Sequence, residues 1–278
     1  MTKIILSATI LLSSFLFSQK TPMQVLPSGH LLVKAKIEGK EGNFIFDTGG
    51  GINLFFNDFA KDLKQKNTYN FFTGFRATGE RLDIPLYKSA EISFADKQFK
   101  NIPYATFDMK MNGVDGLISL PMFQDTDFIL DFDKQELTLA ELKTTVNKKY
   151  FDIQFATNAD NSLDIFTDIL LNNEFKIRVL LDSGAGNNSF WLSEKLISTL
   201  KLDQSKLEMS ERKSEFNPAI TNKFYRGTIQ SISNNFAQVK DPKVVFVEGL
   251  IYEGKTSINW LGKKIGISLK QKKIFILD

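Results

Sequence analysis

Apolar and polar residues alternate in two separate parts of the chain, and each alternating segment leads to a carboxylate. In residues 31–37 every second position is apolar, which is typical of a strand with one buried face. A polar turn at 38–42 follows, and three apolar residues then precede Asp47. Residues 163–181 repeat this order before Asp182. The pattern therefore predicts two β-hairpins, each with a second strand that ends on an aspartate.

The residues after the two aspartates are also alike. A hydroxyl residue and a glycine come first, and they complete the tripeptides Asp47-Thr48-Gly49 and Asp182-Ser183-Gly184. A loop of small residues and an apolar strand follow in both places. Asn57 and Ser193 are good N-cap residues, each with an acidic residue next to it, which predicts helices over 57–63 and 193–200. One such tripeptide arises by chance in many proteins, but two in the same context indicate an internal duplication.

The similarity extends through the later parts of the two copies. Residues 113–139 and 254–276 each contain a glycine-rich entry, an apolar strand and a terminal hairpin. Middle strands are predicted at 90–94 and 228–232. Aromatic residues suit pleated, half-buried surfaces, so the 26 Phe residues also favour a β-rich core. We therefore expect a mostly β protein with two pseudo-symmetric, β-barrel-like lobes, each with a short helix.

This duplication, together with the start of the chain, predicts three segments. Residues 1–19 are expected to be a signal peptide, because Lys3 precedes an apolar run of about fourteen residues that ends in a polar stretch. The N-terminal lobe, 20–145, holds the first tripeptide, and the C-terminal lobe, 146–278, holds the second. The mature protein is expected to be secreted or periplasmic, with a membrane contact only if the first segment is not cleaved.

Composition excludes several classes of chemistry. The 278 residues have a net charge of +3 with acidic and basic residues interspersed, so no basic patch points to nucleic acid. Cysteine is absent, which excludes disulfides and thiol catalysis. His30 is the single histidine, and no G-x-S-x-G motif accompanies it, so we do not expect a Ser-His-Asp triad. One histidine is too few for a His-based metal site, and we expect neither a metal nor a cofactor.

The two tripeptides, in this context, resemble the catalytic loops of the aspartic proteases, the retropepsin-like and pepsin-like family. The resemblance covers most of the chain after residue 20, since the later strands follow the family's order as well. It implies the aspartic protease fold, in which two lobes each contribute one loop. A chain with two lobes holds both loops itself. Because cysteine is absent, the resemblance is closer to compact bacterial relatives of the retropepsins than to digestive pepsins.

The resemblance implies that Asp47 and Asp182 are the catalytic pair of an aspartic endopeptidase. Two carboxylates within about 3 Å of each other cannot both be ionised, so they share a proton. The ionised carboxylate takes a proton from a water molecule that attacks the peptide carbonyl, and the protonated one donates to the carbonyl oxygen. This chemistry requires no metal, cofactor or covalent intermediate.

Four neighbours are expected to support these loops. In the family, hydroxyls at the positions of Thr48 and Ser183 bond across to the opposite loop and hold the two together. Gly49 and Gly184 lack a Cβ, which allows backbone N–H groups to come close to the carboxylates. A local turn is the alternative role for each of these residues. A duplicated β-domain whose carboxylates only close turns is the corresponding alternative for the whole arrangement.

The substrate that the resemblance implies is an extended peptide or protein chain in the cleft between the lobes, held by main-chain hydrogen bonds. A flap usually covers such a cleft. Residues 73–79, with glycines near both ends as hinges, are the first candidate, and Phe75 could close over substrate. Residues 212–222 are a second candidate. The alternative interpretation is that both are ordinary surface hairpins.

Two positions depart from the family pattern, and they leave other functions open. The family usually has a glycine after two apolar residues in the late strand beneath each loop, but Ser119 and Ser257 occupy these positions. A serine could bond to the loop or displace it, and displacement would lower activity steeply. A catalytically silent peptide-binding module on the same fold is therefore the alternative function. A carbohydrate-binding or structural surface protein is less favoured, because Trp191 and Trp260 fall in core-like strands.

Overall fold

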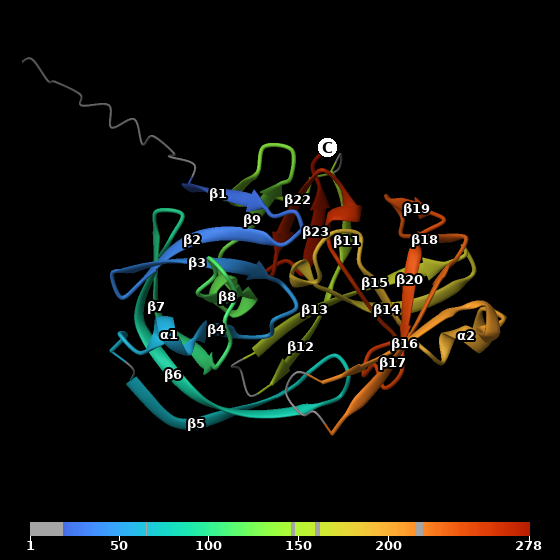
Figure 1. Ribbon diagram of the computed structural model, residues 1–278. Helices are drawn as coiled ribbons and strands as arrows, with labels where there is room; N and C mark the ends of the chain where they lie inside the picture. The colour runs from blue at the N-terminus through green and yellow to red at the C-terminus, as the bar shows by residue number, and fades with distance from the viewer. Residues whose placement is uncertain (1–18, 65, 146–147, 159–161, 215–218) are drawn as a thin grey trace, which may run out of the picture.

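The computed structural model describes most of the chain, namely residues 19–64, 66–145, 148–158, 162–214 and 219–278 (Figure 1). The expected signal peptide, 1–19, lies outside these residues except for Gln19. The described chain is mostly β-strand with only short helices, so the predicted fold class is confirmed. We refer below to residues 19–145 as the N-terminal half and to 148–278 as the C-terminal half.

Six strands of the N-terminal half form a closed barrel. They follow one another around it in the order β2 (Leu31–Ile37), β3 (Lys40–Asp47), β8 (Gly116–Ser119), β4 (Asn53–Phe56), β7 (Lys97–Phe107) and β6 (Arg81–Phe94). The barrel closes because β2 pairs with β6. β5 (Lys66–Phe75) pairs with the first part of β6, and the two strands form a long hairpin (Figure 1). The barrel places Asp47 at the end of β3.

The C-terminal half forms a second large sheet. Its strand order is β16 (Glu208–Lys213), β17 (Thr221–Thr228), β20 (Lys243–Val247), β15 (Phe190–Ser193), β21 (Gly254–Thr256), β14 (Phe175–Leu181), β13 (Ser162–Leu171), β18 (Ser231–Ser233) and β19 (Gln238–Lys240). β12 (Gln154–Asn158) pairs with β13. β14 leads directly into Asp182, as β3 leads into Asp47, so both predicted hairpins are confirmed.

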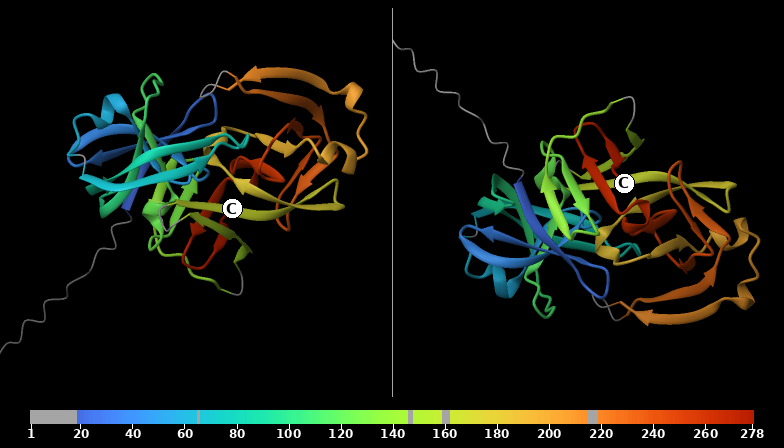
Figure 2. Two further views of the ribbon diagram at one scale, coloured as in Figure 1. Left: turned by 90° about the horizontal axis from the view of Figure 1, so that it is seen from below. Right: turned by 90° about the horizontal axis from the view of Figure 1, so that it is seen from above.

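Strands from both halves join in one antiparallel sheet (Figure 2). Its order is β11 (Lys149–Asp152), β23 (Lys273–Ile276), β22 (Lys264–Ser268), β9 (Phe128–Asp131), β10 (Glu136–Leu139) and β1 (Gln19–Val25). The connection between the halves is the β22–β9 pair, in which Ile265 lies opposite Leu130. Both terminal hairpins predicted from the sequence are in this sheet. Their pairing attaches the end of the chain to the N-terminal half.

The helices are shorter than predicted. The helical segments are α1 (Asn57–Ala60), α2 (Leu196–Thr199) and the 3-10 turns η1 (Leu120–Phe123), η2 (Ser183–Ala185), η3 (Gln204–Lys206) and η4 (Asn259–Leu261). The N-cap residues of α1 and α2 are Phe56 and Lys195, and neither makes a side-chain cap bond. Ser193, the predicted cap, still belongs to β15 and pairs with Val247, so the helix begins later. The predicted helices over 57–63 and 193–200 are therefore wrong in their bounds.

One predicted middle strand is also wrong. Residues 90–94 lie within β6, as expected, but 228–232 are not one strand. β17 ends at Thr228 and β18 begins at Ser231. Between them, the backbone N–H of Ile229 donates to the carbonyl of Pro242, and that of Gln230 donates to the side chain of Asn172. These bonds turn the chain away from β20, which pairs with β17, and toward β13, which pairs with β18.

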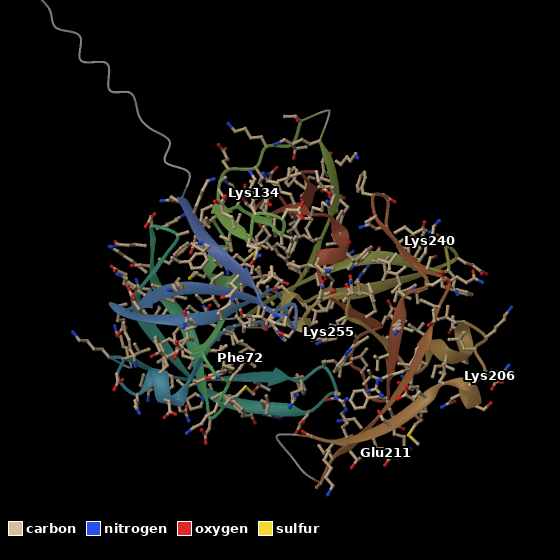
Figure 3. All side chains as sticks on the ribbon, turned by 45° about the horizontal axis from the view of Figure 1, so that its top comes forward. Phe72, Lys134, Lys206, Glu211, Lys240 and Lys255 are labelled. Carbon is tan, nitrogen blue, oxygen red and sulfur yellow. The ribbon has the colours of Figure 1, made fainter. Side chains whose placement is uncertain are left out.

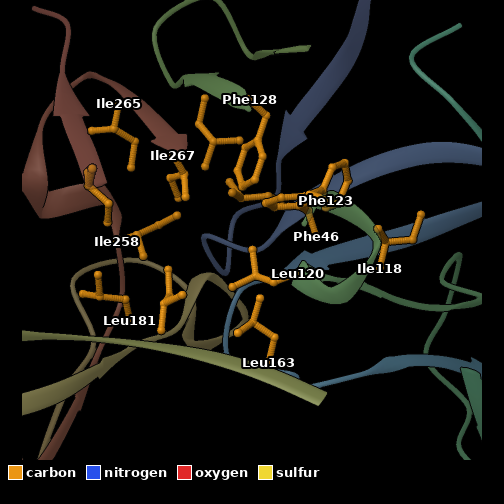
Figure 4. Packing of buried hydrophobic residues seen from close by; sticks show 14 of the residues in the cluster. Phe46, Ile118, Leu120, Phe123, Phe128, Leu163, Leu181, Ile258, Ile265 and Ile267 are labelled. Carbon is orange, nitrogen blue, oxygen red and sulfur yellow. The ribbon is translucent and has the colours of Figure 1, made fainter. Parts of the chain in front are cut away.

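A continuous apolar core runs from one half into the other (Figure 4). Phe46, the residue before Asp47, is fully buried with its ring 5.6 Å from that of Phe123 and 5.3 Å from that of Phe128. Leu181, the residue before Asp182, is fully buried in the same cluster. Close packing of this kind leaves little room for movement. The core therefore fixes the position of both aspartates.

Candidate active site

The two aspartates occupy the same place in two copies of one strand arrangement. β8 lies parallel to β3 and places Ser119 beside Asp47. β21 lies parallel to β14, and the carbonyl oxygen of Thr256 accepts a hydrogen bond from the backbone N–H of Asp182 at 2.8 Å. A late strand therefore runs beneath each aspartate, as the repeated pattern in the sequence predicts.

Thr48 and Ser183 hold the two loops together through four buried hydrogen bonds. The Thr48 backbone N–H donates to Ser183 Oγ at 3.0 Å, and the Ser183 backbone N–H donates to Thr48 Oγ1 at 3.0 Å. Each hydroxyl then donates to the carbonyl before the opposite aspartate, Thr48 to Leu181 and Ser183 to Phe46, both at 2.7 Å. Every bond has its counterpart in the other half. The structure thus brings the two predicted support residues together across the junction.

The glycines of the two loops face the opposite carboxylates. A Cβ added to Gly49 would lie 2.6 Å from Cγ of Asp182, and one added to Gly184 would lie 2.6 Å from Cγ of Asp47. Real Cβ atoms do not approach a carboxyl carbon this closely, so only glycine fits at either position. These contacts show that Asp47 and Asp182 lie face to face across the junction, as predicted.

Asp47 is partly buried, and its surroundings raise its pKa well above the usual range. Burial is the main cause, followed by the charge of Asp182 and a hydrogen bond between the two carboxyl groups. The backbone N–H of Gly49, which donates to Asp47 Oδ1 at 2.9 Å, and the charge of Lys255 lower the pKa by less. A raised pKa favours the protonated form of Asp47 near neutral pH. Asp47 therefore holds a proton more readily than an ordinary carboxyl group.

A lysine lies beside the other aspartate. Nζ of Lys255 is 2.8 Å from Oδ2 of Asp182, and their side chains are only 15% and 8% exposed. The ammonium group also lies 4.6 Å from the ring centroid of Trp191. Figure 3 shows Lys255 where the two halves meet. The ion pair places a positive charge directly beside the two aspartates.

Our sequence analysis did not single out Lys255 as a site residue. The registers of the two halves show what it replaces: β8 pairs with β4 at Leu117–Leu54, and β21 pairs with β15 at Lys255–Trp191. Lys255 therefore stands where the first copy has Leu117. The available signal in the sequence was a charge at a position that is apolar in the other copy.

A third carboxyl group, that of Asp164 on β13, was also missed. It is partly buried, its Oδ1 has no hydrogen-bond partner among the described residues, and burial with the charge of Asp182 raises its pKa to about 7. Tyr252 lies near both acids, and burial with the charges of Asp164 and Asp182 raises the pKa of its hydroxyl to about 12. Asp164 alternates with apolar neighbours in its strand, so the sequence predicts an exposed position.

Asp47 and Asp182 line one cavity of ≈ 340 Å³. Most of its wall comes from the N-terminal half and is apolar, including Leu54, Phe56, Phe75, Leu82, Ile84, Phe107, Met109, Met111 and Leu117. Lys255 and Tyr252 contribute from the C-terminal half. This cavity, which we call the dyad cavity, is where a substrate would meet both carboxyl groups.

The first predicted flap, 73–79, reaches over the dyad cavity. Phe75, Arg76 and Ala77 at the turn between β5 and β6 line it, and Phe75 is 57% exposed. The carbonyl oxygen of Ala77 accepts a hydrogen bond from the backbone N–H of Ile251 at 3.0 Å. The hairpin therefore extends from the N-terminal barrel to the C-terminal half, which Figure 2 also shows.

The second predicted flap, 212–222, is the turn of the β16–β17 hairpin. Residues 215–218 of it lie outside the described part of the chain. Arg212, Lys213 and Ser214 line a neighbouring cavity rather than the dyad cavity. The hydroxyl of Ser214 donates to Glu80 at 2.5 Å, which connects the two hairpins.

The two serines that depart from the family pattern are both fully buried but differ in their bonds. Oγ of Ser257 accepts a hydrogen bond from the backbone N–H of Ser189 at 3.1 Å. Oγ of Ser119 has no partner among the described residues, although its backbone N–H donates to Asn53 at 2.9 Å. Both loops keep their matching bonds, so a serine is compatible with the loop geometry in each half.

Other candidates from the sequence do not contribute to this site. Nδ1 of His30 lies 2.7 Å from the hydroxyl of Ser28, and no carboxylate contacts the ring in the part of the chain that the structure describes. Across the described ranges, no three His, Asp or Glu side chains are grouped as metal ligands would be. None of the described helices has the length and apolar character that a membrane crossing requires.

Comparison with known proteins supports an aspartic protease family. Residues 33–122 match a family model described as aspartyl protease. This segment contains the first tripeptide and ends in η1, and it does not extend into the C-terminal half. No curated protein matches the chain. The match therefore supports the family through the N-terminal half, and the paired arrangement with Asp182 is an observation of the structure.

Proposed function

We propose that this protein is a single-chain aspartic endopeptidase with two lobes, 20–145 and 146–278, that each supply one catalytic loop. The observation that carries the proposal is that Asp47 and Asp182 face each other across the junction and line one cavity. The matching bonds of Thr48 and Ser183 support it, because they hold the loops in register. Such positioning is required for two groups to act on one substrate.

The surroundings assign different roles to the two acids. Asp47 is the general acid, because burial and the neighbouring Asp182 charge raise its pKa and keep its proton in place. Asp182 is the general base, because it is the partner of the protonated Asp47 and only its Oδ2 is bound to Lys255, at 2.8 Å. Its Oδ1 is buried and receives no hydrogen bond from an N–H or hydroxyl of the described residues, so this oxygen can accept a proton from water.

In the proposed reaction, Asp182 removes a proton from a water molecule as the water oxygen attacks the peptide carbonyl carbon. Asp47 donates its proton to the carbonyl oxygen, which gives a tetrahedral gem-diol. Collapse of this species breaks the C–N bond, and the proton held by Asp182 goes to the leaving amine. Asp47 recovers its proton from the second hydroxyl, so the cycle closes. The bond between Ala77 and Ile251 must open to admit an extended peptide.

The segment before the first lobe adds a proposed location. A positive residue, an apolar run and a polar exit in residues 1–20 favour export from the cytoplasm by a cleaved signal. We therefore propose a secreted or periplasmic enzyme that acts on extended peptides or proteins. N-terminal sequencing of the exported protein tests this part, since the proposal requires a start near residue 20.

Hydrolysis of a peptide pool tests the enzymatic proposal. The purified protein is incubated with mixed peptides from pH 3 to 8, and products are followed by mass spectrometry. Asp47→Asn and Asp182→Asn should each abolish cleavage while the thermal unfolding curve stays cooperative. Cleavage that persists in either variant would come from a contaminant or another site, and it would overturn the proposal.

One observation favours the alternative of a silent peptide-binding module. Nζ of Lys255, 2.8 Å from Oδ2 of Asp182, occupies one of the two oxygens of the proposed base. If no peptide is cleaved at any pH, but peptides bind with measurable affinity to the dyad cavity, the module is the correct interpretation. Binding that is lost in a variant with a bulky residue at Leu117, which lines the cavity, would place the peptide there.

A further inference from the structure

A second cavity of ≈ 330 Å³ opens beside the dyad cavity, on the side of Asp182. Arg76, Ala77 and Lys255 line both cavities, so the two cavities adjoin each other. The remaining wall residues of the second cavity are Thr78, Trp191, Arg212, Lys213, Ser214, Asn222 and Phe224. We call it the basic cavity, because four of its wall residues are Arg or Lys and none of the wall residues that the structure describes is Asp or Glu.

The basic side chains reach this cavity from three different elements. Arg76 comes from the turn between β5 and β6, Arg212 and Lys213 from the end of β16, and Lys255 from β21. A cluster assembled from separate elements is more than a local charge run, because folding must bring the like charges together at a cost. Lys255 lies where the two halves meet (Figure 3).

Two acidic side chains among the described residues lie near this cluster. Asp182 neutralises Lys255, and Glu80 approaches the wall through its bond with Ser214. Among the residues that the structure describes, Arg212 and Lys213 form no ion pair, and the guanidinium of Arg212 lies 5.8 Å from the ring centroid of Phe224. Arginine on an aromatic face retains donors at its edge for a planar carboxylate.

The two walls beside the aspartates therefore differ in kind. The N-terminal wall has Leu54 and Leu117, and the C-terminal wall has Trp191 and Lys255 at the same register positions. A substrate that spans both must be apolar on one side of the reacting bond and can be anionic on the other. We propose that the basic cavity is a subsite for a carboxylate, so that the enzyme prefers peptides with an acidic residue near the scissile bond. This proposal rests on the proposed endopeptidase function and adds its substrate class.

Matched peptides that differ by a single charge test this preference. All peptides share one sequence with an apolar residue at the scissile bond. They differ only at one position, which is Glu in one peptide of a pair and Gln in the other. This position is varied over the two residues on either side of the scissile bond. We expect kcat/KM to be about 10-fold higher for Glu at one position, in line with a charge-assisted hydrogen bond. Free and amidated C-termini separate a side-chain carboxylate from a terminal one, and a preference that follows only the terminus would overturn the side-chain proposal.

Two variants locate the effect. Arg212→Gln and Lys213→Gln alter exposed side chains, and each should reduce the Glu-over-Gln ratio at least threefold while the unfolding curve is retained. Lys240→Gln removes one charge from β19, away from this wall, and should leave the ratio as it is. High salt should lower the ratio for the unaltered protein as well.

The possible outcomes distinguish a failure of the subsite proposal from a failure of the endopeptidase proposal. If neutral peptides are cleaved in an Asp47-dependent manner but no position prefers Glu, or if Arg212→Gln leaves the preference intact, the subsite is wrong and the enzyme stands. If nothing is cleaved, the same peptides are measured by fluorescence anisotropy against the Asp47→Asn variant. Tighter binding of the Glu peptide that Arg212→Gln removes would support the subsite without hydrolysis, and equal binding would reject it.

Discussion

In the N-terminal half, Leu54 and Leu117 lie opposite each other beside Asp47, whereas Trp191 and Lys255 occupy the same register positions beside Asp182. Around these positions the backbone is the same: a parallel late strand, a facing glycine and a hydroxyl that bonds to the other loop. Backbone geometry leaves few alternatives where two carboxyl groups must meet, since a Cβ would collide there. Wall residues carry no such restriction, so they can set the substrate and the charge of the site.

The two halves also differ in the side chain that lies next to the catalytic loop of the opposite half. Gly51 lies next to Asp164, with 3.5 Å between a Cβ built on the glycine and Oδ1 of Asp164. Gly186 lies next to His30, with 3.9 Å between its built Cβ and Cε1 of the ring. Each glycine is four residues after its aspartate, so the contacts are equivalent. The acid therefore stands where the other half has an imidazole, and it adds a third carboxyl group near the pair.

The largest effect is expected for this third carboxyl group. The pKa of Asp164 is about 7 in the folded protein against 3.8 for an ordinary Asp, so the folded state binds more protons than the unfolded state between these values. The free energy of unfolding should then fall as pH rises from about 4 to 7. Asp164→Asn should remove this cost and stabilise the protein by up to about 4 kcal/mol at pH 8, with little change at pH 4.

Urea unfolding at both pH values measures this effect, and Asp168 on the same strand provides a control with the opposite sign. Hydrogen bonds and charges from Lys176 and Arg178 lower the pKa of Asp168, so its contribution is present above pH 4 and is lost as the pH falls through its lowered pKa. Because that group is partly exposed, Asp168→Asn should destabilise by less than about 1 kcal/mol at pH 8. An Asp164→Asn protein that is less stable at pH 8 would contradict the assignment.

The facing glycines should show the next effect, and here the two halves should agree. In Gly184→Ala the new methyl group meets Asp47, and in Gly49→Ala it meets Asp182, at 2.6 Å from Cγ in both cases. Each loop must shift, and a displacement of about 1 Å costs about 100-fold in rate, or about 2.7 kcal/mol. We expect kcat/KM to fall to this extent or further in both variants. A large loss in one variant alone would show that the halves are not equivalent at this point.

Exchange of Lys255 for the residue of the other copy tests whether the walls control the charge of the site. The charge of Lys255 lowers the pKa of Asp47, so Lys255→Leu should raise that pKa further. Asp47 would then keep its proton to higher pH. The basic limb of the pH profile of kcat/KM should therefore move to higher pH. Lys240→Leu is the matched control and should not move the limb, and a downward shift in Lys255→Leu would contradict the argument.

The features that the sequence predicted belong to the repeated backbone of the two halves, and those that it missed are contacts between distant residues. The hairpins that lead to Asp47 and Asp182 were predictable because alternation and turns are local signals, repeated in two copies. The sheet that joins the halves required pairing between residues such as Leu130 and Ile265, and no local pattern encodes that contact. Lys255 in a strand predicts a solvent-exposed side chain. Only the tertiary structure shows that it lies against Asp182.

The smallest effect concerns two serines that occupy equivalent positions but have different partners. Oγ of Ser257 accepts a bond from the backbone N–H of Ser189, whereas Oγ of Ser119 is buried and has no partner among the described residues. Removal of a bonded hydroxyl leaves a buried N–H unpaired, whereas removal of an unpaired one relieves a cost. Ser257→Ala should therefore destabilise by about 1 kcal/mol, and Ser119→Ala should be neutral or stabilise by up to about 1 kcal/mol. Urea unfolding of both variants at one pH gives the comparison, and equal losses would mean that the two hydroxyls have equivalent partners in solution.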